Sequence, residues 1–163
     1  EDSENGKAER QMASEHLNRH ARLEFNIPGV TFGGRYEKSP VIVHDGAVLP
    51  SDEPNKYVAT ASPGGRPPHV WFEDGQSLFD LFHSEWTLLA LGSDAPSTDE
   101  LERAAQSVKM DLRVVRIPQN ALRDLYEAPL VLIRPDQIVA WRGASDKGAQ
   151  QILSQVMGHG QLK

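Results

Sequence analysis

The pattern of apolar residues changes along the chain, from helical spacing near the N-terminus to short apolar runs in the C-terminal part. Residues 8–24 carry a thin apolar stripe at helical spacing, so they predict a helix that needs a neighbour to pack against. The stripe consists of Met12, His16, Leu17 and Leu23. Residues 44–68 are rich in proline and glycine and predict an irregular linker or covering loop. Beyond this stretch, short apolar runs alternate with amphipathic segments, which is typical of a mixed α/β domain.

The pattern predicts each element of that domain. The predicted strands are 86–91, 112–117, 130–133 and 138–141, with shorter ones at 41–43 and 69–72. The predicted helices are 98–110, 121–127 and 146–157, with a short one at 78–83. Ser77 is placed to cap the short helix, and Ser97 with Glu100 reads as a capping box for the helix that follows the first long strand.

The element order from Trp86 onward is β-α-β followed by β-β-α. A βαβ crossover makes its two strands parallel, and a hairpin makes its two strands antiparallel. The order therefore predicts a mixed sheet with helices on both faces, as in a thioredoxin-like α/β fold. We expect two parts: residues 1–62, an N-terminal helix with an extended lead-in, and residues 63–163, a thioredoxin-like domain without redox cysteines.

The turn between the first long strand and its helix is Gly92-Ser93-Asp94-Ala95-Pro96. A thioredoxin-like fold has its redox turn there, but a dithiol cycle needs thiolates and this chain has no cysteine. We therefore expect this turn to be structural. The Ala128-Pro129 bond precedes the next strand, where either proline isomer is compatible with the sequence.

Composition narrows the classes of partner. The formal net charge is −6 and the basic residues are scattered, which argues against a nucleic-acid partner. No window approaches 18 consecutive apolar residues, so we expect no membrane span. The absence of cysteine fits a reducing, cytoplasmic location. The chain begins at Glu1 instead of Met, which we interpret as a processed or excised piece of a longer protein.

Two constellations of side chains are candidate sites. His16 and His20 have the i, i+4 spacing of a shared metal, but a zinc motif needs a third ligand and has glutamate where this chain has Leu17. Arg66 and His69 flank a Pro-Pro pair near Trp71 and could bind an anion or stack on a ligand. The more ordinary interpretation is that Arg66 holds its loop in place. We predict no catalytic, cofactor-binding or metal residues, and only ligand or interface contacts by Arg66, His69 and Trp71.

Several stretches resemble a known family. They are PGGRPPHVWFEDGQSLFDLF (63–82), WTLLAL (86–91), LVLIRPDQIVAWRG (130–143) and FNIPGVTFGGRYEKSPVI (25–42). They are similar to the C-terminal part of flavin-dependent aromatic-ring hydroxylases of the phenol hydroxylase and dichlorophenol monooxygenase group. The resemblance implies hydroxylation of a phenolic ring with FAD, NAD(P)H and oxygen in the parent protein. It also implies a thioredoxin-like appendage that gives structural support or subunit contacts.

The family holds FAD through an N-terminal G-x-G-x-x-G unit that this sequence lacks. We therefore expect an inactive fragment whose partners are its own missing flavin domain or a second copy of itself. Residues 8–24 should pack poorly on the α/β domain, or fill an intermolecular contact. One alternative is a stand-alone, redox-inactive binding module with a surface near Arg66, His69 and the 92–96 turn. Another is a histidine-based metal protein.

Overall fold

A computed structural model describes residues 3–159 of the chain. Two compact units account for these residues. The first combines the chain up to Gly33 with Ser51–Val58, and the second combines Gly34–Pro50 with the chain from Ala59 onward. The two units are described separately below.

The first unit consists mainly of a long helix, α1 (Glu4–Phe25), followed by a short one, α2 (Pro28–Phe32). The Ser3 hydroxyl accepts a hydrogen bond from the Gly6 N–H and begins α1 as an N-cap. The end of α1 is closed by Asn55, whose side-chain amide donates to the carbonyl oxygens of Arg22 (3.1 Å) and Asn26 (2.7 Å). The predicted helix is confirmed, and none of its residues, 4–25, is buried.

A close backbone contact joins α2 to the 51–58 segment of the same unit. The Gly29 N–H donates to the Pro54 carbonyl at 3.0 Å. A Cβ at Gly29 would lie 2.0 Å from the Glu53 carbonyl oxygen, a distance that no side chain could tolerate. This position therefore needs glycine.

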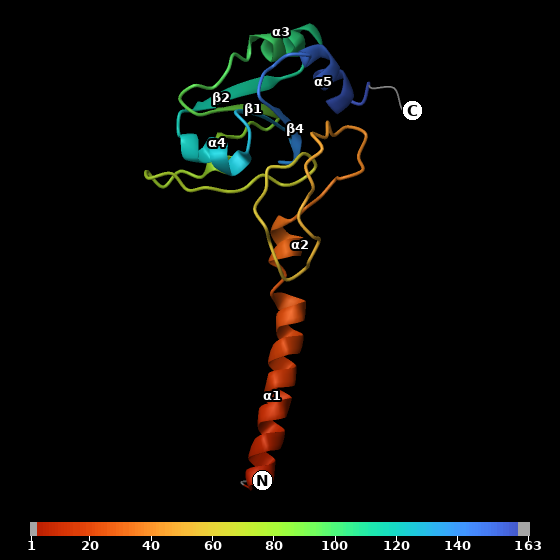
Figure 1. The fold of residues 1–163 in the computed structure, drawn as a ribbon, viewed down its shortest axis with the longest axis vertical. Coiled ribbons are helices and arrows are strands. Elements are labelled where there is room, and N and C mark those ends of the chain that lie inside the picture. The colour runs from red at the N-terminus through yellow and green to blue at the C-terminus, as the bar shows by residue number, and fades with distance from the viewer. Residues whose placement is uncertain (1–2, 160–163) are drawn as a thin grey trace. The chain divides into compact units, whose positions relative to one another are not determined.

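The second unit is built on a four-stranded mixed sheet with the order β2-β1-β3-β4 (Figure 1). The strands are β1 (Trp86–Leu91), β2 (Leu112–Ile117), β3 (Leu130–Ile133) and β4 (Val139–Gly143). β1 runs parallel to β2 and antiparallel to β3, and β3 pairs antiparallel with β4. The predicted β-α-β and β-β-α arrangement is confirmed.

Helices cover both faces of this sheet (Figure 1). α3 (Asp99–Ser107) and α5 (Ala149–Val156) lie on one face, while α4 (Asn120–Tyr126) and the 3-10 helix η1 (Leu78–Leu81) lie on the other. Alternate strand residues face opposite sides, so two cores form. Leu88 and Leu132 belong to the core under α3 and α5, whereas Leu89, Val131 and Tyr126 belong to the other core.

The structure corrects several expectations. Residues 41–43 form no strand, although Ile42 is fully buried and the Val43 N–H donates to the Ala140 carbonyl. Residues 69–72 form only an isolated bridge, Trp71 with Ser77. Both predicted strands are therefore wrong, because each run makes too few ladder bonds to be a strand.

The predicted capping box at Ser97 and Glu100 is also wrong. The N-cap of α3 is Thr98, and the Glu100 N–H donates to the Asp146 carboxylate at 2.8 Å. All peptide bonds among the described residues are trans, Ala128-Pro129 included. Within residues 3–159, every helix is too short or too polar to cross a lipid bilayer.

Candidate functional site

Arg66, His69 and Trp71, the residues singled out from the sequence, lie together around Phe79. The His69 ring meets the rings of Trp71 and Phe79 edge-on, with centroids 4.9 and 5.0 Å apart. The Arg66 guanidinium lies 5.3 Å from the Phe79 centroid, a cation–π contact. The Trp71 side chain is 68% exposed, which leaves a large aromatic surface in contact with solvent.

A tight hairpin positions Trp71. The Phe72 N–H donates to the Gln76 carbonyl and the Gly75 N–H to the Phe72 carbonyl, each at 2.9 Å. At the turn, the Asp74 carboxylate accepts from the Gln76 N–H at 3.0 Å. The Asp-Gly pair at 74–75 could have predicted this hairpin, because such pairs favour tight turns. We refer to residues 70–77 as the aromatic hairpin.

His69 and Ser77 form a pair that superficially resembles a base and a nucleophile. Their Nε2 and Oγ atoms are 2.8 Å apart. The Ser77 hydroxyl also accepts from the Phe79 N–H, and the Asp80 carboxylate accepts from the Ser77 N–H, a reciprocal capping box at the start of η1. Ser77 is only 8% exposed, and none of the described carboxylates orients the His69 ring. The pair therefore serves as a helix cap and gives no nucleophile.

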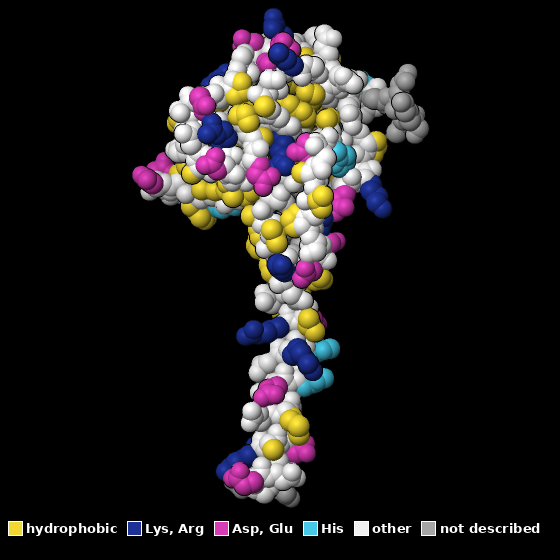
Figure 2. Space-filling view, in the orientation of Figure 1, with side chains coloured by type: hydrophobic (Ala, Val, Ile, Leu, Met, Phe, Trp, Pro, Cys, Tyr) yellow, Lys and Arg dark blue, Asp and Glu magenta, His cyan; other side chains and the backbone are white. Residues whose placement is uncertain are grey.

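A hollow of about 540 Å³ lies beside the aromatic hairpin. Its apolar walls include Trp71, Phe72, Leu81, Ile117 and Pro118. Arg116 and the acidic tip of the hairpin, residues 73 and 74, also line it. In Figure 2 the tip is the leftmost point of the molecule, with acidic side chains at its end and hydrophobic side chains beside it. The hollow is thus mostly apolar with acidic residues at its rim, while the Arg116 guanidinium donates to the Thr98 hydroxyl at the start of α3 (2.7 Å).

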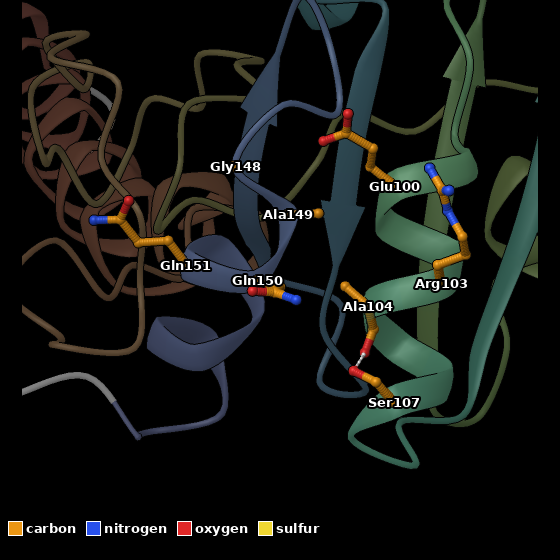
Figure 3. A pocket seen from close by; sticks show the side chains of 8 residues that line it. All are labelled: Glu100, Arg103, Ala104, Ser107, Gly148, Ala149, Gln150 and Gln151. Carbon is orange, nitrogen blue, oxygen red and sulfur yellow. Dashed lines mark hydrogen bonds between the residues drawn. The ribbon is translucent and has the colours of Figure 1, made fainter.

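A second hollow of about 650 Å³ lies between α3 and α5 (Figure 3). Ala104 and Ala149 face each other across it and leave the space unfilled. Figure 3 shows the side chains of Arg103 and Gln151 extending away from the gap between the helices. The side chains of Glu100 and Gln150 extend toward the gap instead, so one carboxylate and one amide are the polar groups that face this hollow (Figure 3).

The strand–turn–helix at 86–107 does not fit the diphosphate of FAD. Such a group needs free N–H donors at a helix N-terminus. Here the Asp99 N–H donates to the Ser97 hydroxyl and the Glu100 N–H to Asp146. The first turn of α3 also carries three acidic residues, Asp99, Glu100 and Glu102, which would repel phosphate.

The 92–96 turn is tied to α4 by two side chains of that helix, Asn120 and Arg123. The Ser93 N–H donates to the Asn120 side-chain oxygen at 3.2 Å, and Arg123 pairs with Asp94 at 2.7 Å. These bonds occupy the polar groups that a ligand at this edge of the sheet would use. They are consistent with the structural role expected for the turn.

His16 and His20 are exposed on α1 with their rings stacked, centroids 6.1 Å apart and planes at 11°. Within residues 3–159, no three histidine, aspartate or glutamate side chains cluster closely enough to hold a metal ion. The histidine pair therefore lacks the third ligand that a metal centre of the zinc type requires.

A buried ion cluster around Arg142 was missed from the sequence. Arg142 is 7% exposed, and its guanidinium donates to Asp45 at 2.6 Å, to Glu127 at 2.8 Å and to the Tyr126 carbonyl at 3.1 Å. Burial by itself raises the pKa of Asp45. The hydrogen bonds from Arg142 and the Ala47 N–H and the charge of Arg142 outweigh burial, so the pKa lies below its ordinary value. The available signal was a single arginine within the buried run IVAWRG.

The cluster fixes a segment that we call the strap, residues 34–50, to the α/β domain. Further along the strap, Gln155 donates to the carbonyl oxygens of Pro40 and Ile42. Two main-chain hydrogen bonds join the start of the strap to residues 64–66. The Tyr36 N–H donates to the Gly64 carbonyl, and the Arg66 N–H donates to the Gly34 carbonyl. The strap is therefore part of the second unit, which is consistent with the burial of Ile42.

Comparisons with known proteins agree with this fold. The model of the family described as aromatic-ring hydroxylase, C-terminal, matches residues 60–160. FAD-dependent monooxygenase apdD of Emericella nidulans is 34% identical over 141 residues, 80% of this chain and 22% of that protein. For 2,4-dichlorophenol 6-monooxygenase of Delftia acidovorans, identity is 32% over 136 residues, 72% of this chain and 23% of that protein.

A solved structure extends the match to almost the whole chain. The rebeccamycin biosynthetic enzyme RebC with reduced flavin has a TM-score of 0.82 at 31% identity, covering 98% of this chain and 30% of its own. The similar proteins are thus flavin-dependent monooxygenases. This chain belongs to the aromatic-ring hydroxylase C-terminal family, and the resemblance seen in residues 63–82 and 130–143 is confirmed. The chain spans between a fifth and a quarter of the length of the curated relatives named above.

Proposed function

We propose that this chain is the non-catalytic C-terminal domain, with its lead-in, of an FAD-dependent monooxygenase that hydroxylates phenolic or related aromatic rings. In this proposal the domain is thioredoxin-like without redox chemistry, and it supports the fold or the subunit contacts of the parent. FAD and NAD(P)H bind elsewhere in the parent chain, in the cytoplasm, and the flavin part is the main partner of the present residues.

The observation that carries this proposal is the exposure of α1. The helix has 22 residues, none of them buried. Its apolar side chains Met12, Leu17, Leu23 and Phe25 are 57%, 65%, 58% and 78% exposed. In folded proteins most helical stability comes from packing against neighbouring elements, so the four exposed apolar side chains of α1 are consistent with a neighbour outside this chain. The rest of a flavin enzyme, about three times the length of this chain in the relatives, would supply that neighbour.

The site geometry supports the non-catalytic part of the proposal. Ser77 acts as a cap, the α3 N-terminus is occupied by the chain's own side chains, and the histidines of α1 have no third ligand within the described part of the chain. Each of these three groups therefore has a structural partner or lacks a necessary one among the described residues.

The coding sequence upstream of Glu1 tests the proposal first. We expect an open reading frame of several hundred codons with a G-x-G-x-x-G after a predicted strand. The encoded protein should bind FAD and oxidise NAD(P)H in the presence of a phenol. A start codon close to Glu1 would contradict the proposal and favour a stand-alone binding module.

Substitutions in the full-length protein test the absence of catalysis here. Arg66→Ala and His69→Ala should leave kcat within a factor of about two, because neither residue would touch flavin or substrate. A loss of about 100-fold or more in kcat, with FAD content and thermal stability unchanged, would show that this domain takes part in the reaction.

A further inference from the structure

We propose that the hollow beside the aromatic hairpin is a binding site for a small organic cation, a molecule that carries an ammonium group on an apolar body. The apolar body lies among the hydrophobic walls, and the ammonium group lies between the Trp71 ring and the acidic tip of the hairpin. This site does not rest on the proposed function, because every residue that forms it belongs to the second unit and no reaction is involved.

The hollow has the size and the walls of a small-molecule site. Its volume of about 540 Å³ lies within the range of pockets that enclose small ligands, about 300–1,000 Å³. Three parts of the chain surround it: the aromatic hairpin, the end of η1 and residues 116–122, which join β2 to α4. Phe72, Leu81, Ile117 and Pro118 provide apolar surface for the hydrocarbon part of a ligand.

The charge of the hollow selects a cation. Glu73 and Asp74 line it, and Glu73 forms no hydrogen bond or ion pair with any of residues 3–159. Asp74 uses one carboxylate oxygen to accept from the Gln76 N–H at 3.0 Å. The guanidinium of Arg116 donates to the Thr98 hydroxyl at 2.7 Å, at the start of the helix on the opposite face of the sheet. The negative charge at the hollow therefore has no basic neighbour to compensate it, so it attracts cations and repels anions.

The exposed ring of Trp71 provides a second, independent contact for a cation. Trp71 is 68% exposed, whereas Trp141 is 8% exposed and lies in a core. Indole attracts cations more strongly than the rings of tyrosine or phenylalanine do. The edge-on contact with His69 and the main-chain hydrogen bonds of the hairpin hold the ring in place before a ligand arrives. A ring that is already positioned loses little conformational entropy on binding.

An organic cation matches these features better than a metal ion does. Among the residues that the structure describes, no three histidine, aspartate or glutamate side chains lie close enough together to hold a metal. A bare metal ion would also leave the apolar walls of the hollow unused. An ammonium group on an apolar body uses the walls, the Trp71 ring and the free Glu73 carboxylate together.

Three probes with the same phenyl ring test the preference for positive charge. They are 2-phenylethylammonium, 2-phenylethanol and 3-phenylpropanoate, each titrated into the 163-residue chain while NMR shifts of the backbone amides around the hollow are recorded. We expect the ammonium to bind with a dissociation constant in the millimolar range, at least about threefold tighter than the alcohol. The carboxylate should bind most weakly, because Glu73 and Asp74 repel it.

Substitutions separate the contribution of charge from that of the aromatic ring. Glu73→Gln should weaken binding of the ammonium about two- to fivefold and leave binding of the alcohol unchanged. Glu85→Gln is the matched control, because Glu85 is an exposed acidic residue of the same unit that lies outside the hollow. Trp71→Leu keeps an apolar side chain but removes the ring, so it should lower the affinity for the ammonium at least about threefold more than the affinity for the alcohol. Circular dichroism should show that all three variants remain folded.

Three results with the chain itself would overturn the proposal. They are amide shifts around the hollow that do not saturate with the ammonium up to about 50 mM, an alcohol or carboxylate that binds as tightly as the ammonium, and equal losses for Glu73→Gln and Glu85→Gln. In a longer parent protein the ammonium should still bind. Loss of binding there would instead assign the hollow to a side chain of the parent. Failure of the flavin proposal would leave the titrations of the 163-residue chain unaffected.

Discussion

Removing the negative charge of Asp45 should destabilise the α/β domain, because it leaves a buried arginine short of a partner. Arg142 is 7% exposed and contacts Asp45 at 2.6 Å, while its second carboxylate partner, Glu127, is largely exposed. Asp45→Asn keeps the shape and an oxygen for the Ala47 N–H but not the charge. Breaking a fully buried ion pair costs about 3–5 kcal/mol.

The expected loss is smaller than that range. The Asp45 side chain is 28% exposed, and the Glu127 carboxylate and the Tyr126 carbonyl continue to accept from Arg142. We therefore expect Asp45→Asn to lower the free energy of unfolding by about 2–3 kcal/mol. For a chain of this size that is a fall in Tm of about 4–12 °C.

Urea unfolding followed by circular dichroism measures this loss. Asp94→Asn is the matched control, because its pair with Arg123 is exposed and should contribute at most about 1 kcal/mol. A double-mutant cycle with Arg142→Met should give a coupling energy of at least about 1 kcal/mol. Additive effects of the two substitutions, or equal losses for Asp45→Asn and Asp94→Asn, would refute the reasoning.

Acid adds an independent check. The folded-state pKa of Asp45 lies below its ordinary value of 3.8, so its contribution to stability is fully present above that value. The contribution is lost as the pH falls through the folded-state pKa. The stability difference between the wild type and Asp45→Asn should therefore be constant at neutral pH and disappear in strong acid. A difference that remains after Asp45 has become protonated in the folded protein would mean that the charge of Asp45 is not its cause.

Three further substitutions or truncations test the packing. Gly64→Ala should lower the free energy of unfolding in urea by about 2–4 kcal/mol, because its φ is +90° and a Cβ would lie 3.3 Å from the Tyr36 carbonyl. Gly46→Ala is the control. Its φ is +83° but the space around it is open, so the loss should be only about 1–2 kcal/mol. Tyr126→Phe should cost about 1–2 kcal/mol, because its buried hydroxyl donates to the Pro68 carbonyl at 2.7 Å. A chain of residues 63–163 should melt at least about 10 °C below one of residues 34–163, because loss of the strap exposes the site of Ile42 and leaves Arg142 without Asp45.

The sheet could be predicted from the sequence because its strands are short, mainly apolar runs bounded by turn residues. β1 and β2 begin and end where the pattern placed them, although β2, LRVVRI, carries two arginines and is only partly buried. Residues 41–43 show the limit of that signal. This triplet is equally apolar, but it supplies only one fully buried side chain, Ile42, and one hydrogen bond to β4. Apolar character alone therefore did not distinguish an irregular segment with a buried side chain from a strand.

Contacts between residues distant in sequence could not be predicted. The Ser97 and Glu100 spacing satisfied the local rule for a helix cap, but Asp146 lies 46 residues from Glu100 and takes the bond that the local residues were expected to make. The Arg142 cluster joins residues 97 positions apart. Periodicity reports which face of an element is buried, and it carries no information about which remote side chain will meet an unpaired donor.

The candidate site combines residues that could be recognised in the sequence with contacts between distant residues that could not. The sequence singled out Arg66, His69 and Trp71 as possible ligand or interface contacts, and that role stays a prediction, although the structure places the three side chains near one another. It could not separate their tasks. Arg66 stacks on Phe79, and His69 bonds to the cap of η1, so these two side chains are held within the domain. Trp71 is 68% exposed and lies beside a mostly apolar hollow. How much of each side chain stays exposed is therefore a property of the folded structure, and the pattern of residue types along the sequence does not contain it.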